Sequence, residues 1–258
     1  MASLLRLLPA FLLKHLPLAI VFGAWEILSA TRIFPESLLP AFSQVVAAWL
    51  SLLLSGEILV HAVSSIWREA AGFGLSVIFG AAVGIGMARS RRLQEFAEPL
   101  ITLIFPLPKS ALIPVLIVWL GIGHTSKIAV IFLGCILPVV VSSFNGAKGV
   151  DRFVIWSARN MGTSGRKLLW RIIIPAALPD IMSGTRLALA ISFILLVSSE
   201  MLASDSGLGF LIFFLGEGGD YAGMFASIMT VTLLGFFADR LYLSFMNWVL
   251  VWHGEQPS

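Results

Sequence analysis

The chain has 258 residues, of which 58% are hydrophobic and 12% are charged, with a net charge of +3. A soluble domain usually carries about 25% charged residues, and a water-soluble fold of this length exposes too much surface to hide so many apolar side chains. The mean hydropathy of +0.96 therefore excludes an ordinary soluble domain and predicts an all-α integral membrane protein. Because no basic patch is interleaved with aromatic residues, we expect no nucleic-acid partner.

Six segments are apolar enough to cross a bilayer, whose core needs about 20 mostly apolar residues per helix. They cover residues 16–30, 63–88, 100–120, 127–144, 185–203 and 221–237, and the last of them extends to residue 252 if the helix continues. The sequence contains no repeat and no soluble domain. We therefore expect a single polytopic membrane domain over residues 1–258, with about six transmembrane helices.

Polar residues separate the first of these segments from the second. Glu26 lies near the end of the first, and a polar stretch with Arg32, Glu36 and Glu57 follows. The third segment is interrupted by three prolines, at positions 106, 108 and 114. Since proline removes a helical hydrogen bond, we expect this crossing to be broken.

The distribution of basic residues predicts the orientation, because cytoplasmic loops carry the excess of Lys and Arg. One side of the predicted topology has only Arg32 and Lys127. The other side collects Arg6, Lys14, Arg89, Arg91, Arg92, Lys148, Arg152, Arg159, Arg166, Lys167, Arg171, Arg186 and Arg240. Both termini are therefore expected in the cytoplasm, which agrees with an even number of crossings.

The sequence offers no catalytic residues, no metal site and no cofactor site. It has no phosphate-binding loop and no H-E-x-x-H pair, and its four histidines are scattered. The lone Cys135 lies in an apolar run, where we expect a small buried side chain. The chain is therefore not expected to be an enzyme, and a partner or an ion gradient must supply any energy that its work requires.

A long polar segment, 145–184, separates the fourth and fifth crossings. Val154, Ile155, Ala158 and Met161 recur at helical spacing and predict an amphipathic helix outside the bilayer. Ser164 predicts the start of a second short helix over 165–173, which prolines at 175 and 179 would end. The pattern alone leaves two alternatives open: a helix resting on anionic lipid, or a docking surface for another subunit.

Four residues of this segment match a known signature. Ala158, Gly162, Ile172 and Pro175 take the last alanine, the glycine, the isoleucine and the proline of the pattern E-A-A, three residues, G, nine residues, I-x-L-P. The segment thus resembles the corresponding loop of binding-protein-dependent ABC importer permeases. This chain departs from the pattern at three positions, where Trp156, Ser157 and Ile174 replace the glutamate, the first alanine and the leucine.

Shorter motifs extend the resemblance over most of the chain after residue 60. They are similar to the nitrate, sulfonate, taurine and bicarbonate importer class in their order and spacing. The motifs lie at residues 108–115, 119–123, 126–128, 200–201, 207–209, 238–239 and 252–253.

The resemblance implies a type I importer permease of the MetI-like fold in a bacterial inner membrane. Two such chains would pair as a homodimer, two cytoplasmic ATPase subunits with ATP and Mg would hold them, and a periplasmic binding protein would deliver a small solute such as a sulfonate, taurine or nitrate. Residues 145–184 would be the cytoplasmic coupling loop. The implied ATPase-coupling residues are Trp156, Ser157, Ala158, Arg159, Gly162, Thr163 and Pro175.

Charges inside a bilayer usually face a cavity or a partner. We therefore expect Lys109, Ser198, Ser199 and Glu200 to line the translocation pathway, with helix-end or packing roles as alternatives for Glu200 and the serines. Arg68 is expected to snorkel outward. Residues 204–220 predict a re-entrant or interfacial helix, or otherwise a plain loop.

Two other functions fit a polytopic membrane protein. A self-sufficient secondary transporter or channel would need an ion-coupling site and often shows inverted repeats, and neither is clear in this sequence. An intramembrane enzyme would need a nucleophile with a base, or metal ligands, within the spans, and the scattered histidines argue against it.

Overall fold

The computed structural model describes residues 10–35 and 37–253, and every regular element in them is helical. Arg6 and Glu36, which the predicted topology uses, lie outside these residues. In chain order the helices are α1 (Ala10–Ala30), α2 (Phe42–Leu54), α3 (Glu57–Arg89), α4 (Arg91–Ile104), η2 (Lys109–Leu112), α5 (Ile113–Leu120), α6 (His124–Gly149), α7 (Arg152–Asn160), α8 (Gly165–Leu168), η3 (Leu169–Ile173), α9 (Ile174–Leu202), α10 (Leu208–Glu217), α11 (Tyr221–Val249) and η4 (Val251–His253).

Four helices of the described chain are long and apolar enough to span a membrane: α3, α6, α11 and the continuous run Gly165–Leu202 that contains α9. The count becomes five if the bent pair of α4 with η2 and α5 is one span. The first predicted crossing is helical as α1, but its apolar part, Leu16–Ala30, is shorter than these spans. Length and composition therefore support four or five crossings of the predicted six.

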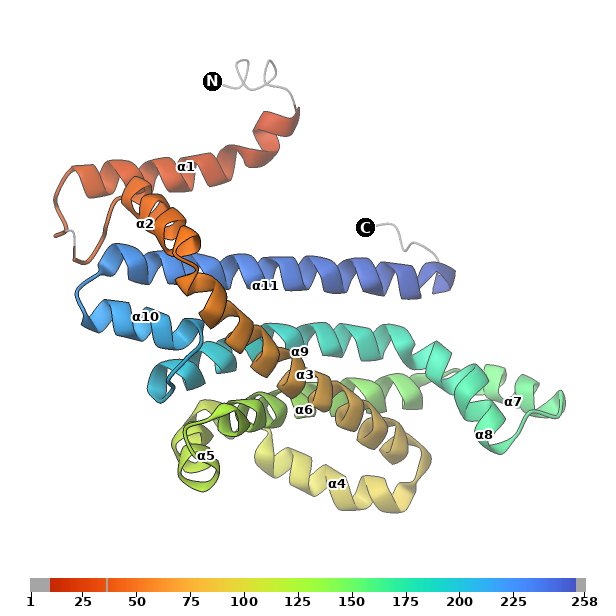
Figure 1. The fold of residues 1–258 in the computed structure, drawn as a ribbon. Helices are drawn as coiled ribbons and strands as arrows, with labels where there is room; N and C mark the ends of the chain where they lie inside the picture. The colour runs from red at the N-terminus through yellow and green to blue at the C-terminus, as the bar shows by residue number, and fades with distance from the viewer. Residues whose placement is uncertain (1–9, 36, 254–258) are drawn as a thin grey trace.

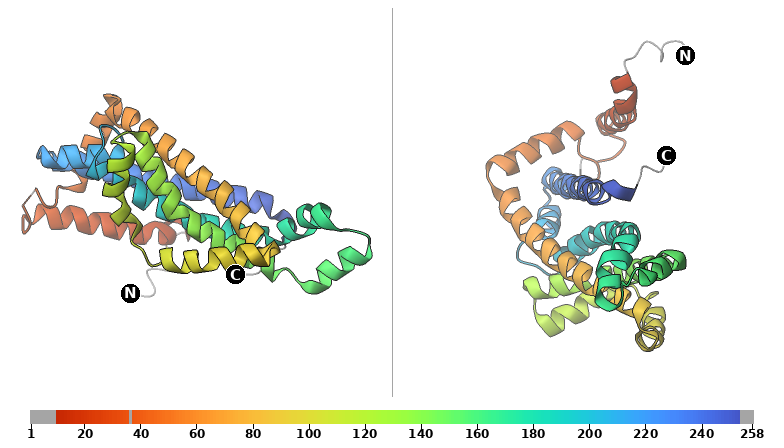
Figure 2. Two further views of the ribbon diagram at one scale, coloured as in Figure 1. Left: turned by 90° about the horizontal axis from the view of Figure 1, so that it is seen from below. Right: turned by 90° about the vertical axis from the view of Figure 1, so that its right-hand side faces the viewer.

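The stretch between the first two predicted crossings is not simply polar, because it contains the apolar helix α2. The Glu26 carboxylate of α1 accepts hydrogen bonds from the backbone N–H and the hydroxyl of Ser43, at 3.0 and 2.7 Å, in the first turn of α2. In the middle of α2, Trp49 Nε1 donates to Thr230 Oγ1 of α11 at 3.1 Å. Figures 1 and 2 show α1 at one side of the bundle, with α2 connecting it to the rest.

The third predicted crossing is broken, as its prolines indicate. Helix α4 and the η2–α5 segment meet at an angle of 89°. Pro106 and Pro108 lie in the break, and Pro114 lies in the first turn of α5, where its missing N–H has no intrahelical partner to lose. Lys109 Nζ donates to the Ile104 and Phe105 carbonyls at 2.9 and 2.6 Å, and so supplies hydrogen bonds to the backbone at the break.

Helices α3, α6 and α9 form the core, with α6 between the other two. A stripe of small residues on α3 faces α6 with four-residue spacing, which allows close helix approach in a membrane. Its members are Gly72, Ser76, Gly80 and Gly84, all buried. A Cβ added to Gly80 would lie 2.8 Å from Val139 Cβ, so the side chain of Val139 on α6 packs directly against the backbone of α3. Cys135 is buried between α6 and α9, as predicted.

Helix α6 begins three residues before its predicted start, and this changes the place of Lys127. The prediction makes Lys127 the first residue of the fourth crossing and counts its charge on the less basic side, whereas it lies inside α6 with no exposed surface. Its ammonium donates to the Ile122 carbonyl in the turn before the helix. Lys127 is therefore a buried residue of α6 and not an exposed charge.

The segment between α6 and α9 forms two short helices, and the second occupies residues 165–173 as predicted. The prolines do not end it. Helix α9 starts at Ile174 with Pro175 in its first turn, and Pro179 is tolerated inside it. The π-helical turn η3, just before Pro175, changes the hydrogen-bond register so that the chain continues as one helical run.

Candidate functional site

Helix α7 presents an apolar surface at one end of the molecule, away from α5 and α10 (Figure 1). Phe153 and Trp156 form an edge-to-face pair with ring centroids 5.6 Å apart, although 70% and 54% of their surfaces are exposed. Met161 is 77% exposed beside them. We call these three residues the α7 patch. Exposed aromatic and methionine side chains are enriched at protein interfaces, so the patch is a candidate docking surface.

The opposite face of α7 is anchored to the bundle. Ala158 packs with Leu168, Ile173 and Ala177 in a buried apolar cluster. Asp151 caps the helix by accepting a hydrogen bond from the Phe153 N–H at 2.8 Å. Helix α7, which carries the patch, is therefore anchored through Ala158 to η3 and the start of α9.

Gly162 ends α7 in a conformation that favours glycine, with φ of +81°. The Gly162 N–H donates to the Arg159 carbonyl and the Thr163 N–H to the Ala158 carbonyl, both at 2.9 Å. This bond pair is the Schellman motif, whose C′ residue is usually glycine. The glycine of the sequence signature is thus explained by backbone geometry.

The structure separates the predicted coupling residues into exposed and inward-facing ones. Trp156, Ser157, Arg159 and Gly162 are exposed, Thr163 and Pro175 are half-buried, and Ala158 is buried. Ser164 takes the N-cap position of α8 as predicted, but its side chain makes no capping hydrogen bond. Of the predicted apolar face, Val154 and Met161 are exposed and Ala158 is buried.

A second candidate site is an ionic cluster buried among α3, α9 and the α9–α10 loop. Arg68 Nη1 and Glu200 Oε1 lie 2.7 Å apart, and both side chains have no exposed surface. Ser65 donates its hydroxyl proton to the same carboxylate, with distances of 2.9 and 2.8 Å to the two oxygens, and the Gly209 N–H donates to Oε2 at 2.9 Å. The Glu200 carboxylate is therefore fully hydrogen-bonded.

Three further N–H groups of Arg68 are also engaged. Its Nε donates to His124 Nδ1 at 3.0 Å, and its two terminal nitrogens reach the carbonyl and the hydroxyl of Ser206 at 2.6 and 2.7 Å. The prediction that Arg68 snorkels outward is therefore wrong. A buried carboxylate on a neighbouring helix satisfies the guanidinium at lower cost than an isolated charge in the bilayer.

The loop after α9 is shaped around Glu200. Gly207 has φ of +109°, and a Cβ there would overlap the Glu200 carboxyl group. Gly207 is the N-cap of α10, and its N–H donates to His61 Nδ1 at 3.0 Å. A helix is therefore present in residues 204–220 as predicted. Outside the spans, the Ser206 hydroxyl donates to Asp205 at 3.1 Å and lowers the pKa of that carboxyl below its ordinary value.

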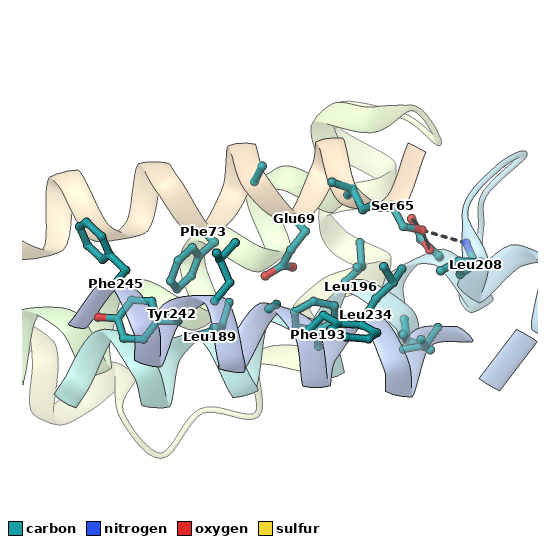
Figure 3. Close-up of a pocket in the computed structure, with 18 residues that line it drawn as sticks. Ser65, Glu69, Phe73, Leu189, Phe193, Leu196, Leu208, Leu234, Tyr242 and Phe245 are labelled. Carbon is teal, nitrogen blue, oxygen red and sulfur yellow. Dashed lines mark hydrogen bonds between the residues drawn. The ribbon is translucent and has the colours of Figure 1, made fainter. Parts of the chain in front are cut away.

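A cavity of about 660 Å³ lies between α3, α9 and α11 (Figure 3). Its walls are apolar, with aromatic rings from all three helices. Its polar lining comes from Ser65, Glu69 and Glu200 of α3 and α9 and from Tyr242 of α11, whose hydroxyl donates to the Met182 carbonyl at 2.9 Å. Glu69 points into this space, although the sequence analysis did not single it out.

The predicted pathway residues do not gather at one place. Glu200 lines the cavity, whereas Lys109, Ser198 and Ser199 are not among its lining residues. Lys109 caps the broken helix, and the two serines donate to carbonyls within α9, those of Ile194 and Leu196. The adjacent charges at positions 68 and 69, inside an apolar run, are the sequence feature that indicates a buried site here.

These features define the class of protein. A chain whose described residues form several apolar helices of membrane length, with charges buried among them and an exposed apolar patch at one end, is a polytopic membrane protein. In the described residues no group of three or more potential metal ligands comes together.

Comparison with known proteins gives the family. Residues 76–249 match the family "Binding-protein-dependent transport system inner membrane component". The taurine transport system permease protein TauC of Escherichia coli (strain K12) is 30% identical over 243 residues, covering 92% of this chain and 88% of the relative. A putative aliphatic sulfonates transport permease protein, SsuC of Bacillus subtilis (strain 168), is 31% identical, covering 92% and 86%.

A solved structure confirms the fold. A chain of the MetNI methionine ABC transporter in an inward-facing conformation superposes with a TM-score of 0.59 at 17% identity, covering 73% of this chain and 96% of that one. The chain therefore belongs to the binding-protein-dependent transport system inner membrane components and is an ABC importer permease, a transport subunit rather than an enzyme. Its similarity to the taurine and sulfonate permeases extends over most of its length.

Proposed function

We propose that this chain forms the translocation pathway of an ATP-driven importer, as one of two identical permease copies held by two separate ATPase subunits that bind ATP and Mg. A periplasmic binding protein delivers the solute. The observation that carries the proposal is the α7 patch, which is exposed although its helix is anchored through Ala158 to the start of α9. A partner that moves the patch moves α9 with it.

The solute is a small organic sulfonate in this proposal. Two relatives that match nine-tenths of the chain are named for taurine and for aliphatic sulfonates. The binding protein selects the solute, so the ligand that a co-encoded binding protein retains tests this part directly.

Copurification and transport assays test the coupling to an ATPase. The full chain is expressed with the ATPase and binding-protein genes that neighbour its own gene. We expect the ATPase to copurify with the wild type and uptake to depend on ATP. Replacing both aromatic residues of the patch, Phe153→Ala with Trp156→Ala, should lose both the copurification and the uptake, because it removes the exposed rings of the interface.

Two further variants sharpen this test. Gly162→Asp should abolish uptake, because a side chain strains the left-handed C′ position. Trp119→Ala is the matched control: this tryptophan is 75% exposed on α5, at the other end of the molecule, and its loss should leave ATPase binding unchanged. Uptake by the chain alone, without an ATPase, would show instead a self-sufficient secondary transporter.

The proposed orientation places α7 and both termini in the cytoplasm of an inner-membrane protein. The chain suits a cysteine-accessibility test, because its one cysteine, Cys135, is buried. We expect Ser157→Cys on α7 to react with an impermeant maleimide only from the cytoplasmic side. Asp205→Cys, in the α9–α10 loop, should react only from the opposite side.

A further inference from the structure

The cavity between α3, α9 and α11 has the size of a ligand pocket. Its volume of about 660 Å³ lies within the range of about 300–1,000 Å³ typical of small-molecule sites. The walls are formed by aliphatic side chains and by the rings of Phe73, Phe193, Phe237, Tyr242 and Phe245. Such walls favour a ligand with an apolar body.

One polar group in this cavity lacks a partner. Glu69 is only 7% exposed, and its Oε1 accepts a hydrogen bond from the Ser192 hydroxyl. Its Oε2 is buried and accepts no hydrogen bond from any residue that the structure describes. Figure 3 shows the carboxylate pointing from α3 across the cavity towards α9. A buried carboxylate oxygen without a partner is costly, so the site is incomplete as the chain alone forms it.

Among the residues that the structure describes, no basic side chain completes the site. The lining residues include no lysine, arginine or histidine. The neighbouring Arg68 is directed to Glu200, His124 and Ser206 instead. The other polar groups of the lining are engaged too: Ser65 donates to Glu200, and the Tyr242 hydroxyl donates to the Met182 carbonyl. In the described part of the chain, the cavity thus offers a carboxyl oxygen without a donor and no basic side chain to pair with it.

We propose that this cavity is a binding site for an organic amine, a molecule whose protonated amino group pairs with Glu69 and whose apolar body fills the aromatic space. A protonated amine supplies both the charge and the hydrogen-bond donors that Oε2 lacks, and the neighbouring ring faces favour a cation further. A sulfonate, a carboxylate or a phosphate would meet only the like charge of Glu69. The site does not depend on the proposed coupling to an ATPase.

Binding of phenethylamine tests the site. The full-length chain is reconstituted without an ATPase in nanodiscs of neutral phosphatidylcholine, and binding of radiolabelled phenethylamine is measured by equilibrium dialysis. The wild type should bind it saturably. Benzylsulfonate and the neutral phenethyl alcohol should each compete at least about tenfold less well than unlabelled phenethylamine, a difference of about 1.4 kcal/mol.

Two variants and one control separate charge, space and general damage. Glu69→Gln keeps the shape but removes the charge, and should weaken binding by at least about tenfold. Ala238→Phe keeps the charge but fills the cavity that Ala238 lines, and should abolish binding. Glu217→Gln removes an exposed carboxylate on α10 that does not line the cavity, and should bind as the wild type does. Each variant is compared by its elution volume and melting temperature, so that misfolding is recognised.

Three results would overturn the proposal. The first is equal binding of benzylsulfonate or phenethyl alcohol by the wild type. The second is unchanged phenethylamine binding by a folded Glu69→Gln variant. The third is a disulfide between two copies of Ala70→Cys, which would show a second copy of α3 at the cavity in place of a ligand. Failure of ATPase binding to the α7 patch would leave these results unaffected and bears only on the proposed function.

Discussion

Arg68 and Glu200 are 132 residues apart in the sequence, yet their side chains form an ion pair of 2.7 Å in which neither has exposed surface. The pair joins α3 to α9 and positions the loop that leads to α10. Because neither group can be hydrated, each is tolerated only in the presence of the other.

Removal of one member of the buried pair should be strongly destabilising. Arg68→Met leaves the buried Glu200 charge unpaired, and Glu200→Gln leaves the buried Arg68 charge unpaired. For either variant we expect a loss of about 3–5 kcal/mol in the free energy of unfolding, measured by denaturant titration in detergent. The double variant should lose less than the sum of the two single losses. Arg91→Ala, which breaks an ion pair whose arginine side chain is 90% exposed, should change stability by less than about 1 kcal/mol. Additive losses would contradict the pairing.

The glycine stripe of α3 should respond to a single methyl group. Gly80→Ala places a Cβ 2.8 Å from Val139 Cβ, so the helices must separate, and we expect a loss of about 1–3 kcal/mol. Gly74→Ala on the same helix meets nothing within 4 Å and should leave stability unchanged or raise it slightly. Thermal unfolding of the two variants in detergent compares them directly, and equal melting temperatures would show that α3 and α6 are not tightly packed.

The α9–α10 loop should loosen when Gly207 is replaced. Gly207→Ala combines a left-handed backbone with an overlap against the Glu200 carboxyl group. We expect the amides of α10 to exchange hydrogen at least about tenfold faster, because local opening becomes easier. Gly56→Ala provides the control, since Gly56 has φ of +83° but no atom within 4 Å of an added Cβ. If Gly56→Ala speeds exchange in α3 as much as Gly207→Ala does in α10, backbone strain alone accounts for the effect.

Helices α9 and α11 are joined by an exposed ion pair and by a hydrogen bond, and we expect only the ion pair to weaken as salt is added. Arg186 Nε donates to Asp239 Oδ1 at 2.7 Å, but both side chains are over a third exposed. Asp239→Asn should therefore cost less than about 1 kcal/mol at low salt, and the difference should vanish near about 1 M salt. Tyr242→Phe, which removes the hydrogen bond to the Met182 carbonyl, should cost about 1 kcal/mol at either salt concentration. A salt-independent loss for Asp239→Asn would contradict this account.

The long helices are predictable from the sequence because a bilayer demands continuous apolar length, and α3, α6, α9 and α11 follow it. Helix α2 was missed because it is too short for that rule and lies between charged residues. The persistence of α9 through Pro175 and Pro179 was missed because it depends on the preceding π turn, which has no sequence rule of comparable strength.

The candidate sites divide in the same way. Gly162 follows from local backbone geometry, so a local signature finds it. The orientation and partner of the Arg68 side chain depend on which residue of α9 lies against it, and no local sequence pattern contains that information. The unpaired oxygen of Glu69 depends on the packing of three helices and is visible only once they are assembled.

The helical run Gly165–Leu202 contains 38 residues without interruption. At 1.5 Å per residue it is a rod of about 57 Å, with the α7 patch mounted at one end and Glu200 near the other. A rod of that length acts as a lever: a tilt of a few degrees about its middle shifts both ends by an ångström or more, in opposite directions. The exposed aromatic patch and Glu200 of the buried ion pair therefore lie at opposite ends of one continuous helical run, so a tilt of this run would displace both.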